Sequence, residues 1–326
     1  MDYKKIVLSV ISVVVVAMMI GTSELLQQRE IIFPEATSVL VGLFLSPKRS
    51  WQVSKPRIFV LIGICSALGL MISVFLPLPL WIKLSIAFII CQFILLFSRT
   101  SFAPLISAAV LPVMLCTESL VCLIAAVGLT GIILLIYILL EKLHITEKEE
   151  FIPLPPPSKS DYSALLLRCA AATACICLAV NVNFLFAVAP PILVAFTELT
   201  RKESMARQKP IKAVGLIFVC TLAGALCRYI LTLRLNLSLT LAAVAAAIIM
   251  VVILHAFKMY LPPAGALTIL AMLVPTENLM IYPLEVLIGT GIFMALAILI
   301  NKKRNKNENH NYQTNKSNCA EKPAVH

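Results

Sequence analysis

Two stretches of the chain place a basic side chain directly before a short helix that starts with proline. Arg99-Thr100-Ser101 precedes Pro104, and Lys258-Met259-Tyr260 precedes Pro262-Pro263. A helix N-terminus presents unpaired N–H groups and a partial positive charge, and both suit an anion. A glycine close behind lets the backbone approach the ligand. The predicted binding residues are Arg99, Thr100, Ser101, Pro104, Lys258, Tyr260, Pro262, Pro263 and Gly265.

A second explanation of Arg99 and Lys258 concerns topology alone. Long basic side chains at the ends of membrane helices reach the lipid headgroups and mark the cytoplasmic side. The two residues would then be anchors with no part in binding. The sequence leaves both explanations open.

Carboxylates form a second candidate group. Thr117-Glu118 and Thr276-Glu277 are the same dipeptide at an offset of 159 residues, near the predicted outer face. Glu118 and Glu277 would bind protons or cations during coupling or gating. The alternative is structural, with threonine as helix N-cap and glutamate in the first turn.

Ionisable residues within apolar segments form a third group, because a charge in lipid is costly and must face protein or water. Arg228 and Glu285 both lie in the predicted outer half and could pair, for gating or as a structural salt bridge. Glu24 and Glu35 are expected to line the outer mouth of the first half. His255 titrates near neutral pH or serves as an interfacial polar group.

Composition places these residues in a membrane. Of 326 residues, 60% are apolar and 13% are charged, and the mean hydropathy is +0.97. Soluble domains are roughly 45–50% apolar and about 25% charged. No nucleotide-binding, zinc or nucleophile motif is present, and the ten cysteines lack metal or disulfide spacing. We expect no cofactor, no metal, no nucleic-acid partner and no enzymatic activity.

Hydropathy divides the chain into two sets of six segments. Residues 1–140 form a first transmembrane repeat, 141–163 a cytoplasmic Pro-rich linker, 164–300 a second repeat, and 301–326 a disordered cytoplasmic tail. Four segments (33–45, 102–116, 185–197 and 261–275) are short and carry proline near their start. The predicted fold is an all-α polytopic membrane protein built from two parallel six-segment repeats with short proline-started half-helices.

The two sets share short motifs in the same order. Lys55-Pro56 corresponds to Lys209-Pro210, Cys65 to Gly69 corresponds to Cys220 to Gly224, and Pro104 corresponds to Pro263. Twelve crossings put the N- and C-termini in the cytoplasm. All but four of the 27 lysines and arginines then fall on that side, the exceptions being Arg29, Lys83, Arg228 and Arg234. The net charge of +11 is therefore mostly a topology signal.

The second repeat resembles a known family. Residues 258–266, Lys-Met-Tyr-Leu-Pro-Pro-Ala-Gly-Ala, are similar to the signature of the HPP family of integral membrane proteins, which is named for His-Pro-Pro. The resemblance covers about 164–303, and the first half carries only a degenerate copy, residues 101–104. It implies a permease for a small anion, since members have been linked to nitrite transport. Leu261 replaces the defining histidine, which bears on the substrate more than on the fold.

The sequence therefore predicts a permease of the inner cell membrane, a secondary carrier or channel for a small anion or organic acid, with its site between the repeats. Its partners would be that anion, membrane lipids and possible further copies of the chain. The alternative is a non-transporting accessory, sensor or assembly subunit that docks through the basic loop 198–212 and the linker. A permease like the aromatic-acid exporters is a further option, although those usually carry a large soluble domain.

Overall fold

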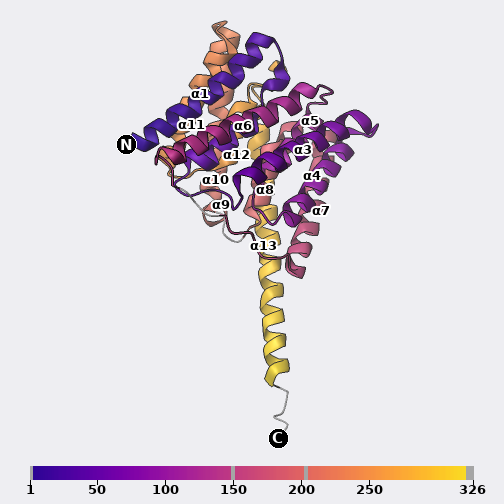
Figure 1. Ribbon diagram of the computed structural model, residues 1–326. Helices are drawn as coiled ribbons and strands as arrows, with labels where there is room; N and C mark the ends of the chain where they lie inside the picture. The colour runs from indigo at the N-terminus through magenta and orange to yellow at the C-terminus, as the bar shows by residue number, and fades with distance from the viewer. Residues whose placement is uncertain (1–2, 148–150, 202–204, 321–326) are drawn as a thin grey trace.

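The structure is a computed structural model, and it describes residues 3–147, 151–201 and 205–320. These residues form helices without a strand (Figure 1). Eight helical segments are long and apolar enough to cross a membrane, which confirms the prediction of an all-α, multi-pass membrane protein. They are α1 (Tyr3–Leu26), α3 (Lys55–Phe75), α4 (Leu80–Phe97), α6 (Leu120–Lys142), α7 (Lys159–Asn181), α10 (Pro210–Cys227) with the π-helix η4 (Arg228–Arg234), α11 (Leu239–Phe257) and α13 (Tyr282–Ala320).

The four short predicted segments are also helices, and each begins with proline. They are α2 (Pro34–Leu40), which continues as the π-helix η2 (Val41–Leu45), α5 (Pro104–Met114), α8 (Pro190–Leu199) and α12 (Pro262–Leu270). Almost all of their residues are buried inside the protein. A short helix exposes unpaired backbone groups at both ends, and in hydrocarbon these groups must be covered. The long helices therefore enclose the short ones.

Polar contacts identify the two ends of the bundle. At one end, which we call the linker end, Lys4 Nζ donates to the carbonyl of His144, and Lys55 is paired with Glu141. At the other, the far end, the Glu24 carboxylate accepts from the backbone N–H groups of Leu239 and Thr240. Short turns flank the short helices, among them η1 (Arg29–Ile31), η3 (Leu185–Val188) and η5 (Thr276–Asn278).

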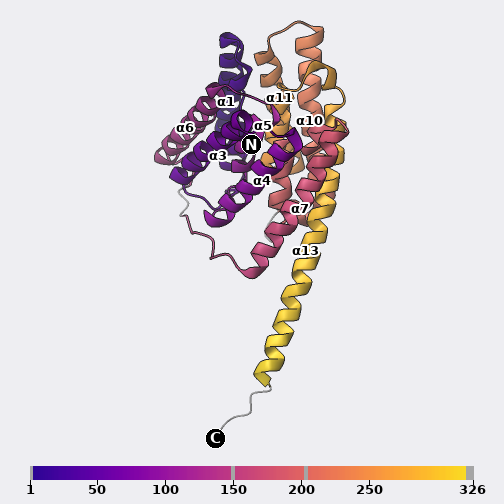
Figure 2. The same cartoon turned by 90° about the vertical axis from the view of Figure 1, so that its right-hand side faces the viewer.

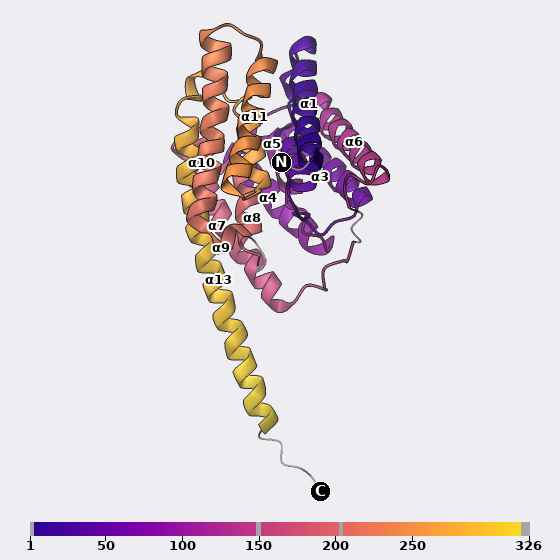
Figure 3. The same ribbon diagram turned by 90° about the vertical axis from the view of Figure 1, so that its left-hand side faces the viewer.

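Helix contacts follow the same pattern in both halves. In the first half α3 packs against α5 and α6, and in the second α10 packs against α12 and α13. Between the halves, α1 contacts α11 as α7 contacts α4, and α2 contacts α12 as α8 contacts α5. Figures 2 and 3 show the first half, in indigo to magenta, beside the second, in pink to yellow. Exchanging the halves maps this set of contacts onto itself.

Two glycines that correspond in the aligned motifs make the same close contact. A Cβ on Gly69 of α3 would lie 2.2 Å from the carbonyl oxygen of Ala109 on α5. A Cβ on Gly224 of α10 would lie 2.2 Å from the carbonyl oxygen of Thr268 on α12. Only the absence of a side chain lets these backbones come so close. Arg99 and Lys258 correspond as well, because both end their helices in the left-handed conformation, with φ of 52° and 47°.

The tail differs from the prediction. The sequence predicts a disordered tail from residue 301, whereas α13 continues to Ala320 and extends away from the bundle (Figure 1). Extending a helix costs far less than starting one, and the membrane span supplies the start. Parts of the predicted linker (148–150), of the basic loop (202–204) and of the tail (321–326) lie outside the described residues.

Replacing Gly224 by alanine is expected to destabilise the protein by about 1–3 kcal/mol, because the added methyl group forces α10 and α12 apart. Gly215→Ala in the same helix is the matched control, since a Cβ there meets nothing within 4 Å. Thermal unfolding in detergent measures both. Equal melting temperatures for the two variants would show that the close contact does not limit stability.

Candidate functional site

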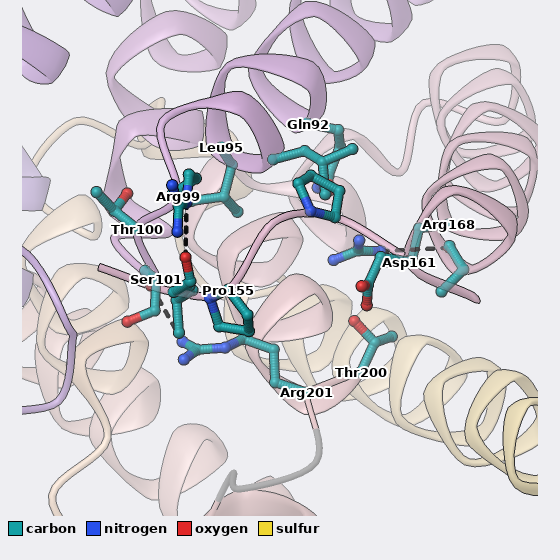
Figure 4. Close-up of a pocket in the computed structure, with 14 residues that line it drawn as sticks. Gln92, Leu95, Arg99, Thr100, Ser101, Pro155, Asp161, Arg168, Thr200 and Arg201 are labelled. Atoms are coloured by element: carbon teal, nitrogen blue, oxygen red, sulfur yellow. Dashed lines mark hydrogen bonds between the residues drawn. The ribbon is translucent and has the colours of Figure 1, made fainter. Parts of the chain in front are cut away.

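A cavity of about 310 Å³ opens at the linker end, between the two halves (Figure 4). The first half contributes α4 and residues 99–101, the second contributes α7 and the end of α8, and the linker covers one side through Leu154, Pro155 and Pro157. This volume is at the lower end of the range for small-molecule pockets, roughly 300–1,000 Å³. The cavity is the best candidate for a solute site because both halves build it.

Three guanidinium groups line this cavity and outnumber its one carboxylate. Arg99 comes from the first half, Arg168 and Arg201 come from the second, and Asp161 is the acid. Guanidinium groups are planar and permanently charged, and they match carboxylates in geometry. The charge balance and the lining therefore favour a small anion, in particular an organic acid.

Local hydrogen bonds hold these arginines at the cavity wall. Arg99 Nε donates to the carbonyl of Leu154 at 2.7 Å, and the Leu154 N–H donates back to the carbonyl of Arg99 at 3.0 Å. Arg201 Nη1 donates to the carbonyl of Ser101 at 3.1 Å. Arg168 Nε donates to the carbonyl of Ala164 at 3.3 Å, one turn back along α7. Each guanidinium is thus positioned by backbone, and the linker is fastened to the first half at Leu154.

Behind the cavity, polar side chains join the halves. Gln92 of α4 is buried and lines the cavity, and its Nε2 donates to Thr197 Oγ1 of α8 at 2.6 Å. The Thr197 hydroxyl donates its own hydrogen bond to the carbonyl of Leu193. Its oxygen can therefore only accept, and this fixes Gln92 Oε1 as the amide atom left without a donor. Nearby, Trp51 Nε1 donates to Glu198 Oε1 at 2.7 Å.

The predicted binding residues separate into three groups. Arg99, Thr100 and Ser101 line the cavity. Lys258 is exposed and Tyr260 half-buried at the position that corresponds to Arg99, where the Tyr260 ring meets His255 edge to face at 5.4 Å. The third group, Pro104, Pro262, Pro263 and Gly265, is buried in helix packing.

Gly265 serves contact between helices. A Cβ at this position would lie 2.8 Å from Val41 Cγ2 and 3.3 Å from the carbonyl of Thr37, so the glycine lets α12 approach α2. The sequence expectation that it brings backbone close to an anion is replaced by this packing role. The structure gives the anion no approach to α12 through Gly265, because protein fills the space.

The predicted carboxylate pair lies at the far end. Glu118 and Glu277 are both exposed in the loops that precede α6 and α13. The alternative explanation, with Thr117 and Thr276 as N-caps, is wrong. Ser119 caps α6 by accepting from the Val121 N–H at 3.1 Å, and α13 begins only at Tyr282. An N-cap must directly precede the first turn that it caps, and both threonines lie too early.

The predicted pairing of Arg228 with Glu285 is wrong as well. Arg228 Nη1 donates to the carbonyls of Ala271, at 2.7 Å, and of Val274, where α12 ends. Glu285 Oε2 accepts from the Phe186 N–H of η3 at 2.8 Å. Each charge satisfies backbone groups that a short helix leaves unpaired. Arg228 thus stabilises the end of α12, and Glu285 stabilises the start of η3.

Glu24 and Glu35 also differ from expectation. Glu24 is exposed but caps α11 with three accepted hydrogen bonds, and so joins the halves at the far end. Glu35 does not line a mouth, since it is only 1% exposed and lies in the core. The sequence places both glutamates near the same end of the bundle. It does not show which of them receives hydrogen bonds from the second half.

Sequence reasoning missed Arg168, Asp161 and Gln92 as cavity residues. Arg168 is the one charged residue of its apolar segment, 164–184, and lies near the start of that segment. Because a charge inside a membrane segment is costly, its position was the signal that could have identified it. Arg201 belongs to the basic loop that the sequence presents as a docking surface. Among the described residues, no group of three or more His, Cys, Asp or Glu side chains could hold a metal ion.

Comparisons with models of protein families, with curated proteins and with solved structures give no match to this chain.

Arg228→Ala is expected to destabilise the protein by about 1–3 kcal/mol, because it leaves the terminal carbonyls of α12 buried and unpaired. Arg234→Ala, in the same π-helix, is the matched control: Arg234 lies against Tyr229, and their hydrogen bond is exposed. Thermal unfolding again provides the measurement. A smaller loss for Arg228→Ala than for Arg234→Ala would contradict the capping role.

Proposed function

We propose that this protein is a membrane permease, a secondary carrier or channel, for a small anion or organic acid. The observation that carries the proposal is the cavity between the halves, which is lined by Arg99, Arg168 and Arg201. Its three guanidiniums supply attraction for an anion, and its position between two packed halves gives the solute a place where relative movement of the halves opens or closes access. The resemblance of residues 258–266 to the HPP family agrees with this solute class.

The two halves are proposed to move against each other about the short helices. The contacts α2–α12 and α5–α8 join the halves at their centre, and α1–α11 and α4–α7 join them at the periphery. The linker crosses the cavity and is bonded to Arg99, so a change in its position changes access from the linker end. Solute binding would favour the arrangement in which the arginines converge.

We place the protein in the inner cell membrane with the linker end in the cytoplasm. Support comes from the positive charges at this end, which include Lys4, Arg49, Lys55 and the cavity arginines. Cys116 then lies on the outer side, where it is exposed after α5.

A membrane-impermeant maleimide is expected to label Cys116 in intact cells, because an exposed thiol outside the lipid reacts as its thiolate. Cys116→Ser should abolish that labelling, and mass spectrometry of the peptide identifies the site. Labelling of Cys116 only after the cells are opened would reverse the proposed orientation.

Uptake into proteoliposomes tests the function itself. Arg99→Gln should raise the solute concentration that gives half-maximal uptake by about three- to tenfold, or roughly 0.7–1.4 kcal/mol, because one charge-assisted contact with the anion is lost. Lys212→Gln is the matched control, since Lys212 is an exposed cation at the linker end outside the cavity. Lys258→Gln shows in addition whether the position that corresponds to Arg99 contributes.

A thermal-shift panel of small anions and organic acids on the purified protein guides the choice of solute. Equal uptake by wild type and Arg99→Gln would refute the role of Arg99 in the solute site. A flat response across the panel, together with no uptake above that of protein-free liposomes, would refute the permease. Co-purification with one fixed partner under those conditions would instead favour the accessory subunit.

A further inference from the structure

Glu35 is an acid in the core of the bundle that has no hydrogen-bond partner among the described residues. It lies in the first turn of α2, is 1% exposed, and neither carboxylate oxygen receives a donor. The helices α1, α5, α6 and α12 pack around α2. Burying a polar group without a partner costs roughly 1–3 kcal/mol for a neutral group and far more for an isolated charge. Such a residue needs an explanation.

Four other glutamates of the bundle each have a donor. Glu24 accepts from Leu239 and Thr240, Glu141 from Lys55, Glu198 from Trp51, and Glu285 from Phe186. Those four contacts join helix ends or the two halves. Glu35 makes no comparable contact, so a structural role does not account for its carboxylate.

The surroundings of Glu35 contain a hydroxyl group but few charges. Ser107 of α5 lies beside the carboxylate, and its hydroxyl is also buried without a hydrogen bond. The titratable side chains at the far end of the neighbouring elements are Glu24 of α1, Cys122 of α6, and Arg29 and Glu30 of η1. Helices α5 and α12 and the π-helix η2 carry no titratable group.

This set of groups suits one ligand, a proton. One carboxylate and one neighbouring hydroxyl supply too few side-chain oxygens for hard cations, which take six or more oxygen ligands. A single carboxylate is sufficient for a proton, and acids within the membrane region commonly serve in proton relays. The π-helical turn that follows α2 points the same way, because such irregular turns are frequent at functional sites.

We propose that the carboxyl group of Glu35 is a proton-binding site that couples solute movement to protons. The inference rests on the proposed function for its role in coupling. The proton binds a carboxylate oxygen to give the neutral acid when α5 and α6 of the first half and α12 of the second enclose α2. The same proton leaves to water, and the carboxylate returns, when movement of the halves opens the contact between α2 and α12. No other reactant takes part.

Carbodiimide labelling tests the site without any transport measurement. The reagent adds to a protonated carboxyl, so in native membranes Glu35 should be modified at mildly acidic pH and progressively less as the pH is raised. Mass spectrometry identifies the modified residue. Glu35→Gln should remove the labelling, and Glu24→Gln should leave it. Absence of labelling at every pH, or labelling that does not change with pH, would overturn the proposal.

Proteoliposomes then test coupling. In Glu35→Gln, uptake driven by an inward proton gradient should be lost, while exchange of labelled for unlabelled solute continues, because a neutral side chain stands in for the protonated state. Gradient-driven uptake equal to wild type would overturn the coupling role. Labelling of Glu35 that changes with pH, in a protein that moves no anion, would leave the proton site standing and refute the permease instead.

Discussion

The requirement that every backbone polar group be satisfied without water governs this structure. Four helices are too short to cross a bilayer, and their ends leave N–H and C=O groups that lipid cannot pair. The protein meets this requirement by burying all four short helices inside a shell of long ones. It also places charged side chains on their ends and on the turns beside them, as Arg228 does on the carbonyls at the end of α12.

Close packing around the short helices has a cost in sequence choice. Gly69 and Gly224 have no side chain because the carbonyls of Ala109 and Thr268 occupy that space. Van der Waals packing and hydrogen bonds, rather than the hydrophobic effect, hold helices together in lipid. Small residues at these crossings are therefore as much a part of the fold as the apolar residues of the core.

The halves share their packing and differ in their chemistry. Glu35, Arg228 and Glu285 each occur in one half only, and the cavity at the linker end takes Arg99 from the first half and Arg168 and Arg201 from the second. A common scaffold with separate polar groups lets both halves contribute arginines to the cavity, while the first half alone supplies Glu35. The proposed permease and its proton site both draw on this division.

The all-helical fold and its apolar segments follow from the sequence because they depend on local properties. Apolar runs determine which segments are membrane helices, proline marks the start of the short ones, and paired motifs such as Cys65 to Gly69 with Cys220 to Gly224 indicate the repeat. The sequence also singled out Arg99, Thr100 and Ser101, which line the cavity, because a basic residue before a proline-started helix is a local pattern.

Only the tertiary structure decided which charged groups meet. Arg228 and Glu285 share a half of the membrane, yet each bonds to backbone from another part of the chain. Glu24 and Glu35 are eleven positions apart in sequence. The second half of the protein supplies hydrogen-bond donors to Glu24 but none to Glu35. Such partners come from segments more than forty residues away, and their choice depends on how helices rotate and cross. Hydropathy and spacing contain no information on that rotation, because every face of a buried helix is apolar.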